Sequence, residues 1–452
     1  MKLSEIAETL RQIRVTPIKT LGQNFLHDQN LARWIVAKAE LRPHDYVVEI
    51  GPGLGALTEH ILVSGARVLA IEKDARLVQF LRERFSNERF EVMHADALQF
   101  DVRKLFAKGK VKLLANLPYY VSTQLIMRFI DPPSPIAFAL LMLQKEVARR
   151  LAASPGTEDH GILTLMVQVH CRVEYLKTVS ATAFLPQPEV DSAFVRLTPR
   201  DPAELPEYDA ETFSALVRQG FSQRRKQLGK LIRSDLPTWD EAAPQLGINL
   251  KARAEDLSLE QWITLTNLLR PFSPPTSSSG LQERFAIVNE EDDVIGEAAR
   301  AEVHGNNLLH RAVHLFIFNP ARELFLQKRS RWKDRHPFLW DSSAAGHVNA
   351  GETYDETARR ELMEELGIST KLERLLKLPA SDKTGQEFIW LYRGQHGGPF
   401  QIARSEIEYG AFFPLNVIEE WIANRPHDFA PGFIECWSAF QPFRLTKPEP
   451  ED

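Results

Sequence analysis

Apolar and polar positions follow two different periods along the first 200 residues. Short apolar runs at 47–50, 67–71, 90–94 and 112–115 have the length of buried strands, and the stretches between them, such as 56–63, have a helical pattern. Strands that alternate with helices predict an α/β fold around a parallel sheet. Further along, the pattern becomes mostly helical at 211–269, and after 280 it mixes strands with one strong helix predicted at 354–366.

A proline- and serine-rich stretch separates the two halves of the chain. Residues 269–280 read LRPFSPPTSSSG, a composition typical of an extended, flexible linker. We therefore expect an α/β core at 1–200, a small helical lobe at 201–270, a linker at 271–280 and an α+β domain at 281–452.

Composition places the chain among ordinary globular proteins. Its 452 residues are 44% hydrophobic and 25% charged, which suffices for two or three packed domains. The net charge of −5 is uneven, because the residues after 270 hold 20 Lys and Arg against 28 Asp and Glu, so we expect different partners for the halves. Two cysteines, Cys171 and Cys436, offer no disulfide framework and favour a reducing cytoplasm. We expect neither a signal peptide nor a membrane partner, since no apolar run has the required length.

A glycine-rich turn follows the first predicted strand directly. Gly51, Gly53 and Gly55 come immediately after the apolar run at 47–50, and the helical pattern begins at 56. Strand, glycine turn and helix are the opening of a nucleotide-binding α/β unit, because glycines allow a sharp turn and the close approach of a ligand. Glycine-rich turns also serve plain packing, so this motif alone is a weak indication.

Polar residues end the next three predicted strands. Glu72 follows the glycine turn by roughly 20 residues, where dinucleotide folds place a ribose-binding carboxylate. Asp96 and Asn116 end the following two strands, and ligands bind at this carboxyl edge of open α/β sheets. Each residue could instead cap the next helix. All three together, beside a glycine turn, favour a ligand site.

The segment 116–119, Asn-Leu-Pro-Tyr, has residue types that can activate an exocyclic adenine amine. Such an amine is a poor nucleophile because its lone pair is delocalised into the ring. The side-chain oxygen of Asn116 and the carbonyl of Leu117 or Pro118 can accept its two N–H groups, which frees the lone pair to attack a methyl donor. Pro118 stiffens the loop, and Tyr119 can stack on an extruded base. A helix cap followed by proline is the alternative explanation.

Nine segments in order resemble the KsgA-type ribosomal RNA adenine dimethyltransferases, over residues 15–270. They are LGQNFLHD (21–28), EIGPGLGALT (49–58), IEKD (71–74), ADAL (95–98), NLPYYVST (116–123), LQKEVARRL (143–151), FLPQPEVDSAFVRL (184–197), FSQRRKQL (221–228) and RAEDLSLEQW (253–262). The resemblance implies a Rossmann-like methyltransferase that uses S-adenosylmethionine.

The same resemblance implies roles for single residues. Glu72 would bind the ribose of S-adenosylmethionine, and Asp96 would lie near its adenine amine. Residues 116–119 would hold the target base, and Phe184 would stack on its other face unless it is a core residue. The implied cofactor contacts are Asn24, Leu26, Gly51, Gly53, Glu72, Asp96 and Asn116.

The implied substrate is small-subunit ribosomal RNA in the pre-30S subunit, with two adjacent adenines near the 3′ end each methylated twice at N6. The lobe at 201–270 would face this RNA. We expect one short helix-like segment at 221–230 to contact phosphates, unless it is only a solvated helix face. Its basic residues are Arg224, Arg225, Lys226 and Lys230.

Three alternatives to this function were considered, and two of them, an assembly factor and a dehydrogenase, belong to other functional classes. A ribosome-assembly factor with a vestigial methyltransferase site would have lost cofactor positions or the segment 116–119, and neither is lost. A methyltransferase of large-subunit RNA is a closer alternative, against which Leu117 is a thin distinction, since those relatives tend to have isoleucine there. A nicotinamide dehydrogenase would leave the segment 116–119 unexplained.

The second half contains one motif whose physics can be read directly. Glu361, Glu364 and Glu365 occupy positions i, i+3 and i+4 of the predicted helix 354–366, so three carboxylates share one face. Like charges so placed repel each other unless a cation lies between them, and oxygen ligands suit Mg²⁺ or Mn²⁺. Arg360 is expected to pair with a glutamate and orient it.

The whole motif, from Gly346 to Ile368, resembles a complete Nudix box. This implies a metal-dependent hydrolase that acts on a small diphosphate-containing molecule over about residues 281–440, with Glu364 as one candidate base. The residues before the box resemble the branch that also contains isopentenyl diphosphate isomerase. Ala345 stands just before the glycine-histidine pair, where that isomerase uses a cysteine, so hydrolysis is the favoured reaction.

Overall fold

The computed structural model describes residues 3–17, 23–201, 204–232, 239–269 and 283–441. The chain divides into two compact units, residues 1–272 and 273–452, which we call unit 1 and unit 2. The predicted linker at 271–280 lies outside the described residues. In the part that is described, no helix is long and apolar enough to cross a membrane.

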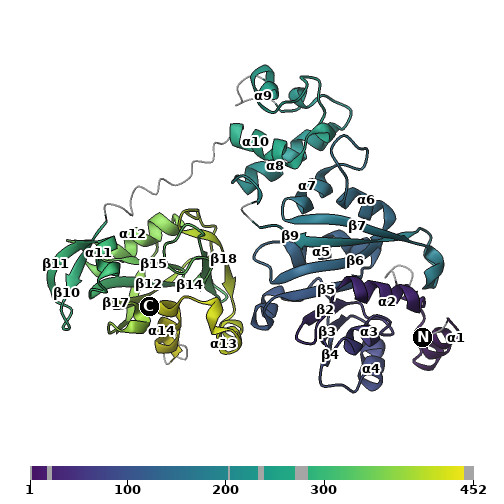
Figure 1. The fold of residues 1–452 in the computed structure, drawn as a ribbon, viewed down its shortest axis with the longest axis horizontal. Helices are drawn as coiled ribbons and strands as arrows, with labels where there is room; N and C mark the ends of the chain where they lie inside the picture. The colour runs from purple at the N-terminus through teal and green to yellow at the C-terminus, as the bar shows by residue number, and fades with distance from the viewer. Residues whose placement is uncertain (1–2, 18–22, 202–203, 233–238, 270–282, 442–452) are drawn as a thin grey trace, which may run out of the picture. The chain divides into compact units, whose positions relative to one another are not determined.

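Unit 1 is built on a seven-stranded sheet with the strand order β4-β3-β2-β5-β6-β9-β7 (Figure 1). The first five strands of this order are parallel, and β9 runs antiparallel to both of its neighbours. The strands are β2 (Tyr46–Ile50), β3 (Arg67–Glu72), β4 (Phe90–His94), β5 (Val111–Asn116), β6 (Ile136–Gln144), β7 (Cys171–Val179) and β9 (Ser192–Pro199). The four strands predicted from apolar runs are confirmed as β2 to β5.

Helices cover both faces of this sheet, because its central strands are apolar on both sides. Val48 lies in one hydrophobic cluster with Phe129 of α5, whereas its neighbour Val47 lies in another with Ile35 of α2 and Ile61 of α3. The helices of the core are α1 (Leu3–Gln12), α2 (Gln29–Lys38), α3 (Thr58–Val63), α4 (Ala75–Arg84), α5 (Ser122–Ile130), α6 (Lys145–Leu151) and α7 (Ile162–Gln168). This is the expected α/β, Rossmann-like arrangement.

The region after the sheet is helical, with α8 (Ala210–Gly220), α9 (Trp239–Gln245) and α10 (Leu259–Leu269). Its core surrounds the buried Trp262 and extends to the α/β part of unit 1 through Leu165 of α7. The prediction of one helix-like segment at 221–230 was wrong. Two short 3-10 turns, Phe221–Gln223 and Leu228–Lys230, replace it, because the backbone at Gln227 is extended and the N–H of Leu228 donates to the carbonyl of Ala252.

Unit 2 contains a nine-stranded mixed sheet in which β12 pairs in parallel with β17, and every other pairing is antiparallel. The strands are β10 (Arg284–Val288), β11 (Val294–Ala299), β12 (His310–Phe318), β13 (Leu324–Arg329), β14 (Trp340–Asp341), β15 (Ala344–His347), β16 (Leu372–Leu378), β17 (Glu387–Gln395) and β18 (Ile407–Phe413). The helices are α11 (Arg300–Gly305), α12 (Tyr354–Leu366), α13 (Leu415–Asn424) and α14 (Pro431–Phe440).

Helix α12 spans Tyr354–Leu366, so the helix predicted at 354–366 is confirmed. Thr353 caps its start in a capping box with Glu356, and Gly367 ends it in the left-handed conformation with φ of 65°. The apolar face of α12 packs on β12 and β15 through Ala358 and Leu362. Glu361 and Glu365 lie beside this apolar face and also approach β15, whereas Glu364 is exposed.

Candidate functional site

A cavity opens at the carboxyl end of β2, at the edge of the sheet where the sequence predicts a cofactor. The residues that line it come from the glycine turn, from the strand β1 (Phe25–Leu26) and from the ends of β5 and β6. They include five of the seven predicted cofactor contacts: Asn24, Leu26, Gly51, Gly53 and Asn116. Gly51 and Gly53 both have positive φ, and a Cβ on Gly53 would lie 3.1 Å from the ring of Phe25. The turn thus needs glycine at both positions.

Glu72 ends β3 next to this cavity and is buried. Its Oε1 accepts the N–H groups of Lys73 and Asp74, both at 2.9 Å, and its Oε2 lies 3.3 Å from the N–H of Gly53. Burial raises the pKa of Glu72, whereas these N–H donors oppose that rise. The carboxylate is held in one orientation and still has lone pairs to accept hydroxyl groups.

Asp96 is the predicted contact that lies furthest from the expected arrangement. It does not line the cavity, and its Oδ2 forms an ion pair with the Nζ of Lys73 at 2.8 Å. Its Oδ1 accepts the N–H of Leu98 at 3.0 Å. The hydrogen bond from Lys73 lowers the pKa of Asp96, so the group is a carboxylate near neutral pH.

The segment 116–119 combines one cavity residue with one core residue. Asn116 lines the cavity and donates its Nδ2 to the carbonyl of Asn24 at 3.1 Å, so its Oδ1 remains an acceptor. The side chain of Leu117 is 2% exposed and belongs to the main hydrophobic core. Leu117 can therefore reach a ligand only through its backbone.

Pro118 and Tyr119 turn the chain into helix α5. The carbonyl of Pro118 accepts the N–H of Val121 at 3.2 Å, which closes a tight turn. The hydroxyl of Tyr119 lies 2.7 Å from the Oγ of Ser192 on β9, and burial raises the pKa of this phenol. This hydrogen bond anchors the end of the Tyr119 side chain to β9.

Phe184 is buried in the core, with only 4% of its surface exposed. It belongs to β8 (Phe184–Leu185), which pairs with β1 so that Phe184 lies opposite Leu26, one of the cavity residues. In this arrangement the ring packs against apolar side chains and presents no face to solvent. Stacking of Phe184 on a base stays a prediction that requires the ring to become accessible.

Glu49 is a cavity residue for which sequence analysis predicted no role. It is the penultimate residue of β2, is 2% exposed, and accepts the Oγ1 proton of Thr58 at 2.7 Å. Burial raises the pKa of Glu49 to about 7, and the charge of Glu72 adds to the rise. The signal in the sequence was a lone carboxylate inside an otherwise apolar strand.

The three carboxylates predicted to bind metal lie together on α12 but differ in burial. Glu365 is 2% exposed and accepts the Nε2 of Gln327 and the N–H of Ala345, both at 3.2 Å. Burial raises the pKa of Glu361 to about 7 and raises that of Glu365 well above its usual range. Glu364 has a side chain that is 57% exposed. One buried, one mostly buried and one exposed carboxyl group therefore face the same region.

Arg360 connects the carboxylates of the motif, which confirms the predicted pairing with a glutamate. Its Nε and Nη2 donate to the two oxygens of Glu352 at 2.9 and 3.0 Å. Its Nη1 donates to Glu361 at 2.8 Å and to Glu364 at 3.0 Å, and its Nη2 also reaches the carbonyl of His347 at 3.2 Å. One guanidinium thereby orients three acidic side chains.

The strand next to α12 leaves room for these side chains. A Cβ on Gly346 would lie 2.0 Å from an oxygen of Glu361, so only glycine fits there without displacing the carboxylate. Ala345 is an alanine, so strand β15 offers no thiol beside the carboxylates. The chain's two cysteines, Cys171 and Cys436, are both buried, and burial raises the pKa of both thiols.

Comparisons with known proteins give a family match in each of the two units. Residues 17–270 match the model of the ribosomal RNA adenine dimethylase family, and residues 308–433 match that of the NUDIX domain. The chain is 43% identical over 253 residues to ribosomal RNA small subunit methyltransferase A of Chlorobium phaeobacteroides, covering 56% of this chain and 94% of that relative. The corresponding protein of Pseudomonas aeruginosa is 44% identical over 253 residues, and this alignment covers 56% of this chain and 94% of that relative.

Among solved structures, a dimethyladenosine transferase from Plasmodium falciparum is similar with a TM-score of 0.46 and 26% identity, covering 53% of this chain and 95% of that one. The family match extends over more than half of the chain and includes the cofactor cavity and the segment 116–119. This protein therefore belongs to the ribosomal RNA adenine dimethylase family, and its second unit is a NUDIX hydrolase domain.

Proposed function

We propose that unit 1 transfers methyl groups from S-adenosylmethionine to N6 of two adjacent adenines near the 3′ end of small-subunit ribosomal RNA, twice at each adenine. The observation that carries this proposal is the position of Asn116, which lines the cavity beside Gly51 and Gly53 and keeps its Oδ1 as an acceptor. The cavity fits the cofactor, since glycines form one wall and the buried carboxylate of Glu72 lies beside them. S-adenosylmethionine supplies the methyl group.

The residues at the end of β5 would prepare the target amine. Asn116 Oδ1 and the carbonyl of Leu117 accept the two N–H groups, which draws the nitrogen toward a tetrahedral geometry and frees its lone pair. Tyr119, oriented by Ser192, provides a stacking face. No strong general base is needed, because the nitrogen becomes acidic once it is methylated. A second transfer to the same nitrogen needs only one remaining N–H acceptor.

The helical lobe and its basic segment would contact the RNA. Arg224, Arg225, Lys226 and Lys230 are all exposed. Arg224 also reaches the carbonyl of Glu158 and the carboxylate of Glu255, so it is less available than the other three. The support from relatives is that two with more than 40% identity are named as small-subunit methyltransferases.

The test is methyl transfer from labelled S-adenosylmethionine to small ribosomal subunits that lack the adenine dimethylation, with large subunits as the alternative substrate. We expect dimethyladenine in the small subunit only. Asn116→Ala should lower transfer by at least about 100-fold, while the exposed control Glu91→Gln should not. Bound cofactor without methyl transfer would support the alternative of a ribosome-assembly factor. Methylation of large subunits would support the alternative of a large-subunit RNA methyltransferase.

We further propose that unit 2 hydrolyses a small molecule that contains a diphosphate, with Mg²⁺ or Mn²⁺ as the required ion. The donor set fits such an ion, because Glu361, Glu364 and Glu365 offer oxygen ligands, and burial raises the pKa of Glu361 and Glu365. The ion would neutralise charge that develops on the diphosphate. Glu364 is the most exposed of the three and stays our candidate for the base.

The hydrolase proposal is tested with a panel of nucleoside and non-nucleoside diphosphates, assayed for released phosphate with Mg²⁺, with Mn²⁺ and with a chelator. Hydrolysis that requires the ion and is lost in Glu365→Gln would support it. A substrate that binds and is never cleaved would point to a binding domain instead.

We also propose that the four parts predicted from the sequence, 1–200, 201–270, 271–280 and 281–452, act as two enzymes joined by a tether. Residues 1–270 and 281–452, expressed separately, should each keep their activity. Loss of either activity on separation would show that the units depend on each other.

A further inference from the structure

One lysine of unit 2 lies beside the carboxylates of α12 without belonging to their motif. Lys333 follows β13 in the turn 330–333, where its N–H donates to the carbonyl of Ser330 at 3.2 Å. Its Nζ forms an ion pair with the carboxylate of Glu406, and only 16% of the Lys333 side chain is exposed. Both residues lie outside the motif from Gly346 to Ile368. An ammonium group that is withdrawn from water in this way requires negative charge around it.

Main-chain hydrogen bonds place Glu406 next to the end of α12. The N–H of Ser330 donates to the carbonyl of Glu406 at 2.9 Å, and the N–H of Glu406 donates to the carbonyl of Ala403 at 2.9 Å. Ala403 in turn donates its N–H to the carbonyl of Glu365 at 2.9 Å. The turn after β13, the loop before β18 and the last turn of α12 are therefore fastened to one another, and Lys333 is part of this junction.

The charge of Lys333 acts on two carboxyl groups of α12. Burial raises the pKa of Glu361 to about 7 and raises that of Glu365 well above its usual range. At Glu361 the charge of Arg360 opposes this rise first, and that of Lys333 adds to the opposition. At Glu365 the main opposing charge is Lys333 itself, whereas the charge of Glu406 adds to the rise. The ammonium is thus the positive charge that serves Glu365.

Other groups around Glu365 do not supply a cation. Among the described residues, the hydrogen bonds to its carboxylate come from neutral groups, Nε2 of Gln327 and the N–H of Ala345. Arg360 bonds instead to other carboxylates of the motif, Glu361 among them. The Oε1 of Gln327 is buried and has no hydrogen-bond partner in the described part of the chain. A cation at this place would satisfy an acceptor that is otherwise left without a donor.

We propose that the ammonium of Lys333 takes the place of the metal ion in the metal-free unit 2, and that the ion displaces it from Glu365 on binding. The inference rests on the ion-dependent hydrolysis proposed above for this unit. A divalent ion brings two positive charges to the same carboxylates. The two cations repel each other, and burial weakens the screening between them, so the same carboxylates do not hold both. The flexible stem of a lysine allows its ammonium to swing out into water.

Lys333 is then a positioning residue with two effects on the ion site. In the metal-free chain it keeps the like-charged side chains of Glu365 and Glu406 together, so that the carboxylates are in place before the ion arrives. As a competitor it lowers the affinity for the ion, so the site fills at a higher Mg²⁺ concentration than the carboxylates alone would require. The concentration of Mg²⁺ at half-saturation is therefore set partly by a residue outside the motif.

The first test measures the affinity of the full chain for Mn²⁺ by electron paramagnetic resonance of the free ion. Lys333→Met removes the charge and keeps the apolar stem, so the affinity should rise at least about fivefold. Lys333→Arg keeps the charge and should not raise it. Lys383→Met is the control for net charge, because that lysine is exposed elsewhere in unit 2. An unchanged affinity in Lys333→Met would overturn the competition.

The second measurement uses the wild-type chain and does not depend on variants that fold. Acetic anhydride labels lysines according to the accessibility of the amine, and mass spectrometry reports each lysine separately. Saturating Mg²⁺ should speed the labelling of Lys333 at least about threefold relative to NaCl of the same ionic strength, because the ammonium leaves Glu365. The exposed Lys383 should react equally in both salts. Equal rates at Lys333 would show that the ammonium stays and would overturn the displacement.

The outcomes separate this inference from the hydrolase proposal. Mg²⁺ that releases Lys333 in a chain that cleaves no diphosphate would support the displacement and contradict the hydrolase activity. In Glu365→Gln, Mg²⁺ should no longer change the labelling of Lys333, and a change that persists there would overturn the role of Glu365. A wild-type chain that binds no Mn²⁺, together with a Lys333→Met variant that binds none either, would contradict both proposals.

Discussion

The side-chain nitrogen of Asn116 donates to the main-chain carbonyl of Asn24, with 3.1 Å between the two atoms. The two residues are 92 positions apart, and both line the cofactor cavity. The hydrogen bond decides which end of the Asn116 amide faces the target, since the nitrogen is occupied and the oxygen is not. An acceptor is what an adenine amine requires, so this contact links the cofactor segment to the chemistry of methyl transfer.

Tyr119→Phe removes the hydroxyl that bonds to Ser192 and keeps the ring. We expect methyl transfer to fall about fivefold, because the loss of a hydrogen bond of about 1 kcal/mol releases the end of the side chain that offers the stacking face. Ser192→Ala should give the same loss, and the double variant should lose no more than either alone. Tyr175→Phe is the matched control, since that hydroxyl also lies 2.7 Å from a side-chain hydroxyl, at Thr178. Additive losses in rates measured on small subunits would contradict the shared cause.

Gly346→Ala places a methyl group where Glu361 now lies, 2.0 Å from its oxygen. The carboxylate can rotate away because it ends a flexible side chain, so we expect a folded protein whose affinity for Mn²⁺ is at least about tenfold lower. Binding can be followed by electron paramagnetic resonance of free Mn²⁺. Gly305→Ala, with open space around the added Cβ, serves as the control. Unchanged Mn²⁺ affinity in Gly346→Ala would exclude Glu361 as a ligand.

Arg360→Ala leaves Glu352, Glu361 and Glu364 without their shared cation. We expect the metal-free unit 2 to lose about 2 kcal/mol or more in its free energy of unfolding, because a partly buried carboxylate group is left uncompensated. Saturating Mg²⁺ should restore part of the loss by supplying positive charge. Thermal unfolding with and without Mg²⁺ measures both effects, and Arg359→Ala, one residue away on α12, is the control. Equal losses in the two variants would contradict the role given to Arg360.

Much of the fold and of the sites followed from local patterns. Asn116 could be placed at a strand end because an apolar run precedes it, and Glu361 could be placed on a helix face because spacing fixes that face. The environment of each side chain could not be read in this way. Phe184 is buried through a pairing with β1, more than 150 residues earlier, and the segment 221–230 is bent by a contact with Ala252. Such long-range contacts leave no local pattern.

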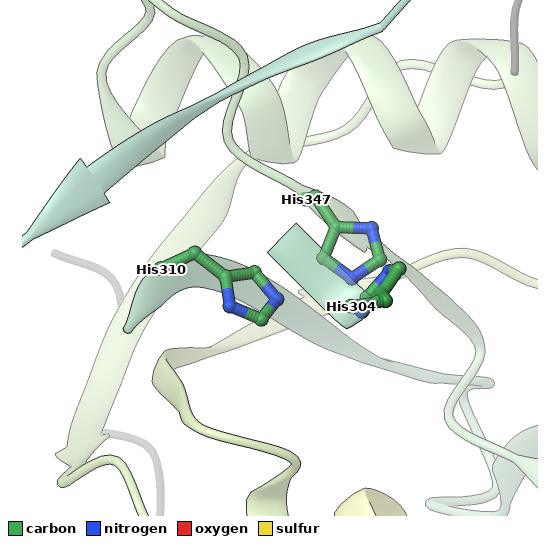
Figure 2. A group of neighbouring side chains, drawn as sticks. All are labelled: His304, His310 and His347. Atoms are coloured by element: carbon green, nitrogen blue, oxygen red, sulfur yellow. The ribbon is translucent and has the colours of Figure 1, made fainter. Parts of the chain in front are cut away.

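Three neighbouring histidines of unit 2, His304, His310 and His347, illustrate the same limit (Figure 2). His304 and His310 are close in sequence, but His347 and Glu387 join them only through the pairing of β12 with β15 and β17. Glu49 differs, since a carboxylate inside an apolar run was visible and its burial could have been inferred. The sequence did not show that Thr58 would be the hydrogen-bond partner of Glu49, or that the charge of Glu72 would lie nearby.

Glu49→Gln removes a buried acid from the core of unit 1 while keeping an oxygen that can accept from Thr58. The folded pKa of about 7 exceeds the ordinary value of 4.5, so the folded chain keeps its proton between these values while the unfolded chain releases it. The stability of the wild type should therefore fall as the pH rises from about 4.5 to 7, by about 3 kcal/mol in all. The variant should lack this contribution.

Calorimetry of the full chain from pH 5 to 8.5 measures the difference in stability between Glu49→Gln and the wild type. The transition of unit 1 can be identified as the one that S-adenosylmethionine shifts in the wild type. The stability of Glu49→Gln relative to the wild type should increase as the pH rises. This increase should level off above pH 7, where Glu49 of the wild type is ionised in the folded and in the unfolded state. Glu91→Gln, an exposed change on β4, should show no such trend. A difference that stays constant with pH would mean that Glu49 is ionised in the folded protein throughout this range.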